Sequence, residues 1–248
     1  MPIAQALSEI HDRMANAALR AQRTPADVTL IAVSKTFPAS AVLEAMAAGQ
    51  RDFGENRVEE ALLKKEEMGG MKLQAIWHLI GHVQSRKAKD VAGQFDWVHS
   101  VDSLKLAEIL SRRASTHQSP IPPMGHPIGD HILLQCNVSG EASKEGFDLT
   151  NWEAEPAKLR AFVAEMEKML ALPALHIGGL MTMAPIVDDP QRARPVFANL
   201  RCLREALRER FPELALPHLS MGMSDDFEAA IAEGSTMVRI GRAIFGSR

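Results

Sequence analysis

The alternation of short apolar segments with longer amphipathic ones is the feature that most constrains how this chain can fold. Eight short apolar segments are expected to be strands, and all but the last are followed by a segment with helical spacing of its apolar residues. Parallel strands need such helical crossovers. The expected strands cover residues 28–34, 52–55, 74–80, 97–101, 131–138, 174–181, 216–219 and 236–240.

The predicted fold is therefore of the α/β class: a single (β/α)8 TIM-type barrel with an extra N-terminal helix at 2–22. A chain of 248 residues has the usual size of one such barrel, so one domain over 1–248 is expected. An open doubly wound sheet is the alternative. Further helices are expected after Pro38, up to about Met68, from Gln84, after Asp102 as N-cap, and at about 152–171, 190–210 and 225–233.

Composition and charge argue against several classes of function. A net charge of −3 gives no general attraction to nucleic acid, and no apolar run approaches the roughly 20 residues of a membrane span. Charged residues interrupt the first 23 positions, so no signal peptide is expected and the cytoplasm is the predicted location. Cys136 and Cys202 form no CxxC motif, which argues against a disulfide framework or a structural zinc site. Residues 117–130, rich in proline and glycine, are expected to be a mobile surface loop.

Lys35 is the strongest candidate for a functional residue at the strand ends, where barrel active sites lie. It follows the apolar segment AVS, and partial burial there favours the neutral amine that forms a Schiff base with a carbonyl. On position alone, a lysine that ends the strand and points to solvent is the stronger alternative.

A phosphate site is expected after the last two strands, on the opposite side of the barrel mouth from Lys35. Ser220, Gly222, Met223 and Ser224 bring small residues and backbone N–H groups before a helix, with Ser224 as its expected N-cap. A well-capped helix start would explain this segment without any ligand. Gly241 and Arg242 open a second short turn, and Arg239 could face the same cavity.

Weaker candidates lie elsewhere on the chain. His78 and His82 do not share a helical face, so no metal site is expected. A basic cluster of Arg86, Lys87 and Lys89 is expected to be a solvated face. The methionines at 181, 183, 221 and 223 are expected to pack around the barrel mouth, an arrangement that also suits an apolar cofactor ring.

Five segments of the sequence together resemble the pyridoxal phosphate homeostasis proteins, which share the fold of the alanine racemase N-terminal domain. The segments, in chain order, are AVSKTFPAS, FGENRVEE, WHLIGHVQSRK, LMTMAP and LSMGMSDDFEAAIAEGSTMVRIGRAIFG. The resemblance runs from about residue 28 to the C-terminus and is broken mainly at 117–130.

This resemblance implies that pyridoxal 5′-phosphate (PLP) is the cofactor, held as a Schiff base on Lys35, with Arg239 near the pyridine nitrogen. Asn56 and His78 would lie near the ring, together with Met181. The phosphate would be surrounded by Ser220, Gly222, Met223, Ser224, Gly241 and Arg242. Two positions depart from the family pattern: Arg57 stands where members usually have tyrosine, and Arg242 where threonine is common. The Arg242 side chain could bind phosphate or point outward while its N–H binds.

Two functions are compatible with a PLP barrel: intracellular PLP homeostasis, with no catalytic residues, and amino-acid racemisation. Racemisation needs a base on each face of the cofactor adduct. In alanine racemase, to which the resemblance extends, the second base is a tyrosine from a partner subunit's separate domain. This chain contains no tyrosine and no second domain is expected, so homeostasis is the predicted function. Apo PLP enzymes are possible acceptors of the cofactor, and a monomer is expected.

Overall fold

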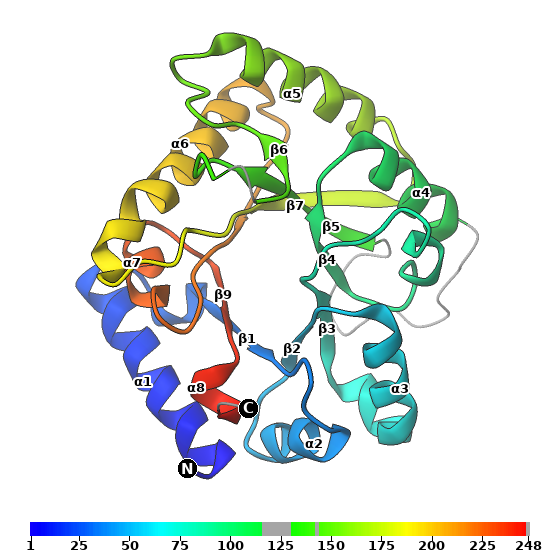
Figure 1. Ribbon diagram of the computed structural model, residues 1–248, viewed down its shortest axis with the longest axis vertical. Helices are drawn as coiled ribbons and strands as arrows, with labels where there is room; N and C mark the ends of the chain where they lie inside the picture. The colour runs from blue at the N-terminus through cyan, green and yellow to red at the C-terminus, as the bar shows by residue number, and fades with distance from the viewer. Residues whose placement is uncertain (116–129, 142–143, 247–248) are drawn as a thin grey trace.

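Eight parallel strands form a closed ring in the computed structural model, which describes residues 1–115, 130–141 and 144–246 (Figure 1). Each strand pairs with its neighbours in chain order, β9 pairs with β1, and the pairing of β4 with β5 completes the ring. This closure confirms the predicted barrel, and the open doubly wound alternative is wrong. The ring consists of β1 (Thr29–Val33), β2 (Asp52–Glu55), β3 (Ile76–Leu79), β4 (Trp97–Val101), β5 (Asp130–Asn137), β7 (Leu175–Met181), β8 (His218–Ser220) and β9 (Met237–Ile240).

Helices cover the outside of the ring (Figure 1). They are α1 (Ile3–Arg20), α2 (Ala39–Ala47), α3 (Val58–Met68), α4 (Leu104–Ala114), α5 (Pro156–Leu170), α6 (Arg194–Arg210), α7 (Phe227–Ala232) and the short α8 (Arg242–Phe245). The N-terminal helix α1 precedes the first strand, as predicted, and lies against α7 and α8. No helix among the described residues is long and apolar enough to cross a bilayer.

The alternation of side chains along each strand divides the core into two parts, because successive residues point to opposite faces of a sheet. In β1, Leu30 and Ala32 pack toward the helices, whereas Ile31 points into the barrel with Trp97, Leu133, Met181 and Met237. A Cβ on Gly178 would lie 2.8 Å from the Trp97 ring, so the glycine makes room for that ring.

Several local expectations were wrong. The segment from Gln84 forms turns and the short 3-10 helix Ala88–Asp90, and Gly93, at φ +72°, lies in the last of these turns. Ser103, not Asp102, is the N-cap of α4, and its hydroxyl accepts a hydrogen bond from the Leu106 N–H. A two-residue strand, β6 (Phe147–Asp148), was not predicted and pairs with β5. The expected mobile loop lies almost wholly outside the described residues.

Candidate cofactor site

The ends of four consecutive strands, β8, β9, β1 and β2, bring most of the candidate residues to one mouth of the barrel. Gly241 follows β9 and packs against β1: a Cβ on it would lie 3.1 Å from the carbonyl oxygen of Val33. The glycine turn therefore lies beside the strand that carries Lys35. The expectation that the two lie on opposite sides of the mouth was wrong, because closing the ring pairs the first strand with the last.

Lys35 lies in a tight turn directly after β1. The Phe37 N–H donates to the Ser34 carbonyl over 3.1 Å, and Thr36 takes a left-handed conformation at φ +68°. The lysine is half-buried, and its side chain makes no hydrogen bond or ion pair with any described residue. Its amine is thus available to a ligand at the mouth.

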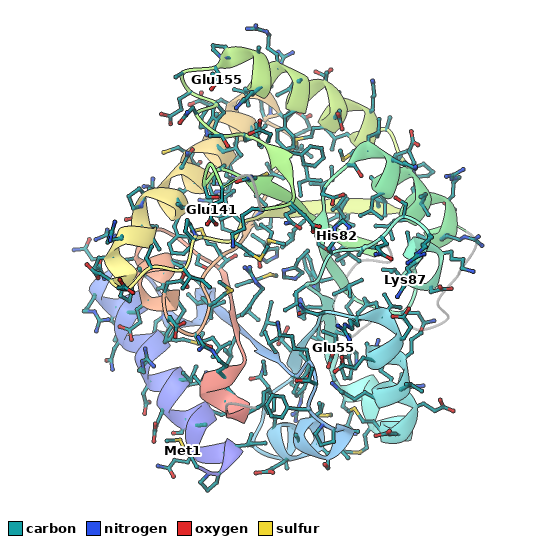
Figure 2. All side chains as sticks on the ribbon, in the orientation of Figure 1. Met1, Glu55, His82, Lys87, Glu141 and Glu155 are labelled. Atoms are coloured by element: carbon teal, nitrogen blue, oxygen red, sulfur yellow. The ribbon has the colours of Figure 1, made fainter. Side chains whose placement is uncertain are left out.

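A buried acid–base pair holds this turn in place, and Figure 2 labels its acid, Glu55. Glu55, at the end of β2, is fully buried and accepts hydrogen bonds from the Ser34 hydroxyl at 2.7 Å and from the Lys64 ammonium of α3. Lys64 also donates to the Ser34 carbonyl over 2.8 Å. Burial raises the pKa of Glu55, and Lys64 partly opposes that rise. Sequence reasoning missed the pair, although a lysine on the apolar face of an expected helix was a usable signal.

Asn56 follows Glu55 and carries an amide oxygen that is buried without a hydrogen-bond donor in the described part of the chain. Its backbone is fixed by Gly81, after β3: a Cβ on Gly81 would lie 2.3 Å from the Asn56 carbonyl oxygen. The Ser100 hydroxyl in turn donates to the Gly81 carbonyl over 2.7 Å. A buried acceptor left unpaired costs stability, so this amide suits a ligand that donates a hydrogen bond.

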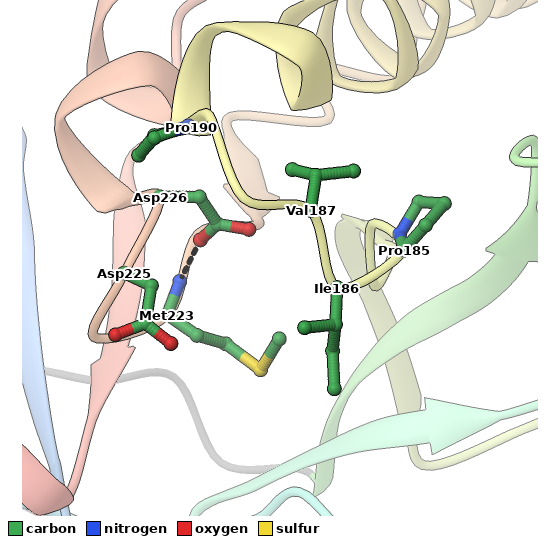
Figure 3. Close-up of a pocket in the computed structure, with 7 residues that line it drawn as sticks. All are labelled: Pro185, Ile186, Val187, Pro190, Met223, Asp225 and Asp226. Carbon is green, nitrogen blue, oxygen red and sulfur yellow. Dashed lines mark hydrogen bonds between the residues drawn. The ribbon is translucent and has the colours of Figure 1, made fainter.

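The loop after β8 approaches the following helix very closely at Gly222. This residue has φ +95°, and a Cβ there would lie 2.6 Å from the Cβ of Ala230. The Asp226 carboxylate accepts from the Met223 N–H at 2.6 Å, which closes the loop (Figure 3). Helix α7 begins only at Phe227, so the expected N-cap role of Ser224 was wrong. Ser224 instead makes no hydrogen bond to any other described residue, which leaves it available to an anion.

A pocket borders this loop (Figure 3). Its other wall is the segment after β7, in which Ile186 is 93% exposed. Asp226 lies at the base of the loop, and burial raises the pKa of its carboxyl while the Met223 N–H and Arg239 lower it. The lining residues are Pro185, Ile186, Val187, Pro190, Met223, Asp225 and Asp226.

Arg239 is a buried cation on β9. One guanidinium nitrogen, Nη1, donates to the Ser220 hydroxyl at 2.6 Å, and the other, Nη2, donates to the Thr182 carbonyl at 3.0 Å. Burial lowers the pKa of Arg239 to about 10, so the group stays protonated at neutral pH. Thr182 was not foreseen as a supporting residue. Its hydroxyl donates to the Cys136 carbonyl over 2.8 Å, which ties β7 to β5 beneath the arginine.

The remaining candidates occupy different settings. His78 is buried, with Asp52 and His99 at its two ring nitrogens, and Met181 belongs to the barrel interior. The Arg242 side chain is 69% exposed and pairs with Asp225, so it points outward and leaves its N–H at the mouth. Arg57 is exposed and precedes α3.

His82, labelled in Figure 2, has two carboxylates around it. Its Nδ1 is 3.2 Å from Asp102 and 2.8 Å from Glu145, and it does not share a site with His78. Ligand atoms of the three groups lie within 4.8 Å of one another, close enough to surround a cation. Contact of the His82 ring with these two carboxylates already accounts for the cluster.

The chain matches the family model of the alanine racemase N-terminal domain over residues 12–248, so it belongs to that class of barrel proteins. It is 45% identical to the protein of Pseudomonas aeruginosa named "Pyridoxal phosphate homeostasis protein", across 99% of this chain and 96% of that one. The protein of the same name from Escherichia coli K12 is 43% identical, across 99% and 97%. The chain therefore belongs to the pyridoxal phosphate homeostasis protein family.

Solved structures agree with this assignment. PipY of Synechococcus elongatus, determined with PLP bound, is 40% identical, with a TM-score of 0.77 and coverage of 98% of this chain and 100% of that one. Alanine racemase of Clostridium difficile shares only 15% identity, with a TM-score of 0.66, and this chain spans 56% of its length. That second likeness concerns the fold alone.

Proposed function

We propose that this chain binds PLP at the barrel mouth through Lys35 and acts in PLP homeostasis. The observation that carries the proposal is a half-buried lysine amine without a partner in the described residues, placed beside a glycine turn. PLP homeostasis proteins at 45% and 43% identity and a solved relative with PLP bound support it.

The residues present fit the chemistry of this cofactor. An aldehyde would condense with the Lys35 amine and release water, which forms a Schiff base. The loop at Gly222 and Ser224, together with the N–H groups after Gly241, offers donors to a phosphate. Asn56 has an unsatisfied buried acceptor nearby, and the Arg239 cation would face the ring nitrogen.

The same residues favour holding the cofactor over catalysis with it. PLP supplies an electron sink when bound, and an arginine at the ring nitrogen disfavours the protonation that strengthens that sink. Racemisation also needs two bases, yet these 248 residues contain no tyrosine. Both nitrogens of His78 are already engaged by Asp52 and His99, so this histidine is not a ready substitute.

The site assignment is tested by borohydride reduction of the purified, PLP-loaded protein, followed by peptide mass analysis. The cofactor mass should be fixed on the Lys35 peptide. Lys35→Ala should lose the label, whereas Lys105→Ala, at an exposed lysine of α4, should keep it. A label on another lysine, or none, would show the assignment to be wrong.

The functional assignment is tested in two further assays. Exchange of the α-proton of alanine and serine in deuterated water should be absent or far below ordinary enzyme rates. Turnover at such rates, abolished by Lys35→Ala, would establish a racemase instead. Transfer of PLP to an apo-enzyme, compared with free PLP at equal concentration, tests delivery to acceptors. The monomeric state, the cytoplasmic location and the single-domain organisation stay predictions.

A further inference from the structure

A continuous line of buried, hydrogen-bonded side chains crosses the barrel interior and ends at Arg239. Neighbouring groups along it are 3.0, 2.9, 2.8 and 2.6 Å apart. Every member except Asp52 is nine-tenths or more buried, and the Asp52 side chain is 21% exposed. The members, in order, are Asp52 of β2, His78 of β3, His99 of β4, Ser220 of β8 and Arg239 of β9.

The two ends of this line fix the direction of their own hydrogen bonds, and a neutral His78 ring extends that order inward. A guanidinium only donates, so Arg239 donates to the Ser220 hydroxyl oxygen. A carboxylate only accepts, so Nε2–H of His78 donates to Asp52. Nδ1 of a neutral His78 is then an acceptor, and it takes the Nε2–H of His99.

The hydrogen bonds in the middle of the line follow the same direction of donation. Nδ1 of His99 is left as an acceptor and receives the Ser220 hydroxyl hydrogen. The reverse orientation would leave that hydroxyl without an acceptor among the described residues, which is costly in a buried site. Burial, and then the neighbouring His78 and Arg239, lower the pKa of His99 well below its usual value, in agreement with a neutral ring.

We propose that Asp52, His78 and His99 are positioning residues, which orient the Ser220 hydroxyl and thereby hold the Arg239 guanidinium in the cofactor site. The line runs from the first residue of β2, at the end of the strand remote from the mouth, to the arginine. Asp52, two strands along the ring from Arg239, therefore controls how Arg239 is held through a line of side chains that crosses the interior. The link to the cofactor rests on the proposed function.

The first test needs neither PLP nor a variant. Nitrogen-15 NMR of the imidazole rings in the PLP-free protein at neutral pH should show His78 and His99 both neutral, and both as the Nε2–H tautomer. A charged ring, or the Nδ1–H tautomer at either position, would overturn the proposal.

Substitutions at Asp52 test whether this carboxylate sets the tautomers of His78 and His99. Asp52→Ala removes the terminal acceptor and should give mixed tautomers at both histidines, whereas Asp52→Asn retains an acceptor oxygen and should preserve them. Asp12→Asn, at an exposed acid on α1, is the control and should change neither ring. Unchanged tautomers in Asp52→Ala would show that Asp52 does not orient the two histidines and would overturn the proposal. If that variant does not fold, Ser220→Ala removes the hydroxyl at the other end of the line and should give mixed tautomers at His99.

PLP binding then tests the effect on the site. Asp52→Ala should weaken PLP binding about tenfold, as expected for a lost hydrogen bond to a charged group, and should change the absorption spectrum of the bound cofactor. An unchanged affinity and spectrum would overturn the positioning role. If the wild-type protein itself fails to bind PLP, the proposed function is wrong. The histidine tautomers then still show whether Asp52 orients the line of hydrogen bonds.

Discussion

Replacing Gly222 with alanine tests whether the glycine loop must approach α7 as closely as it does. The added methyl group would lie 2.6 Å from the Cβ of Ala230 and 3.0 Å from the Cα of Phe227. Carbon atoms prefer about 3.5–4.0 Å, so the loop and the helix would have to separate by about 1 Å. Gly49 provides a matched control, because its φ of +98° is nearly that of Gly222 and nothing lies within 4 Å of the added methyl.

The expected magnitudes follow from these two environments. A left-handed conformation costs an alanine about 1–2 kcal/mol, and Gly49→Ala should lose only that amount. Gly222→Ala carries the same strain plus overpacking of about 1–3 kcal/mol, so its total loss should be about 2–5 kcal/mol. It should also weaken PLP binding, because the displaced loop is part of the proposed phosphate site.

Urea unfolding, followed by tryptophan fluorescence, measures the two free energies of unfolding. A second substitution identifies the contact: Ala230→Gly removes the opposing methyl at its own cost of about 1 kcal/mol in a helix. Added to Gly222→Ala, it should restore part of the lost stability, so the double variant is more stable than the sum of the single losses predicts. Equal losses for Gly222→Ala and Gly49→Ala, or strict additivity in the double variant, would refute the close-approach argument.

Two further outcomes are expected. Burial raises the pKa of Asp226, so the folded state holds this proton more tightly than the unfolded state, and the contribution of Asp226 to stability falls as pH rises through the folded-state pKa. Asp226→Asn should therefore gain stability relative to wild type as the pH rises above the ordinary carboxyl pKa of about 4. If the difference in unfolding free energy between the two proteins does not change with pH there, the raised pKa is wrong. Ser103→Ala removes the N-cap of α4 and should cost about 1 kcal/mol in urea unfolding, and no loss would indicate that the cap is dispensable.

The sequence predicts the barrel well because the pattern that indicates it is local and recurs along the chain. Apolar segments of strand length alternate with amphipathic helices, and the parallel connections leave few ways to close them. The candidate cofactor residues were found for a related reason: a lysine, small residues and glycines at strand ends are conspicuous in the sequence.

The partners of buried polar side chains could not be predicted in the same way. Lys64 and Glu55 are charged residues, which are usually exposed, and their burial depends on the angle at which α3 packs on β2. The line from Asp52 through His99 to Ser220 depends on the stagger of strands on different sides of the ring. The placement of Gly241 beside Lys35 was within reach, because a closed ring makes the first and last strands neighbours.

The contact between α1 and α7 has a consequence for the order in which the protein can mature during synthesis. Arg13 and Arg20 of α1 pair with Glu228, and Arg13 and Glu228 are 215 positions apart in the chain. A ribosome therefore releases α1 long before α7 and α8, which form much of its docking surface, exist. The early helix α2 also contacts α1, but the part of the apolar face that packs on α7 and α8 stays uncovered until those helices emerge. The helix that is made first is thus among the last to find its place.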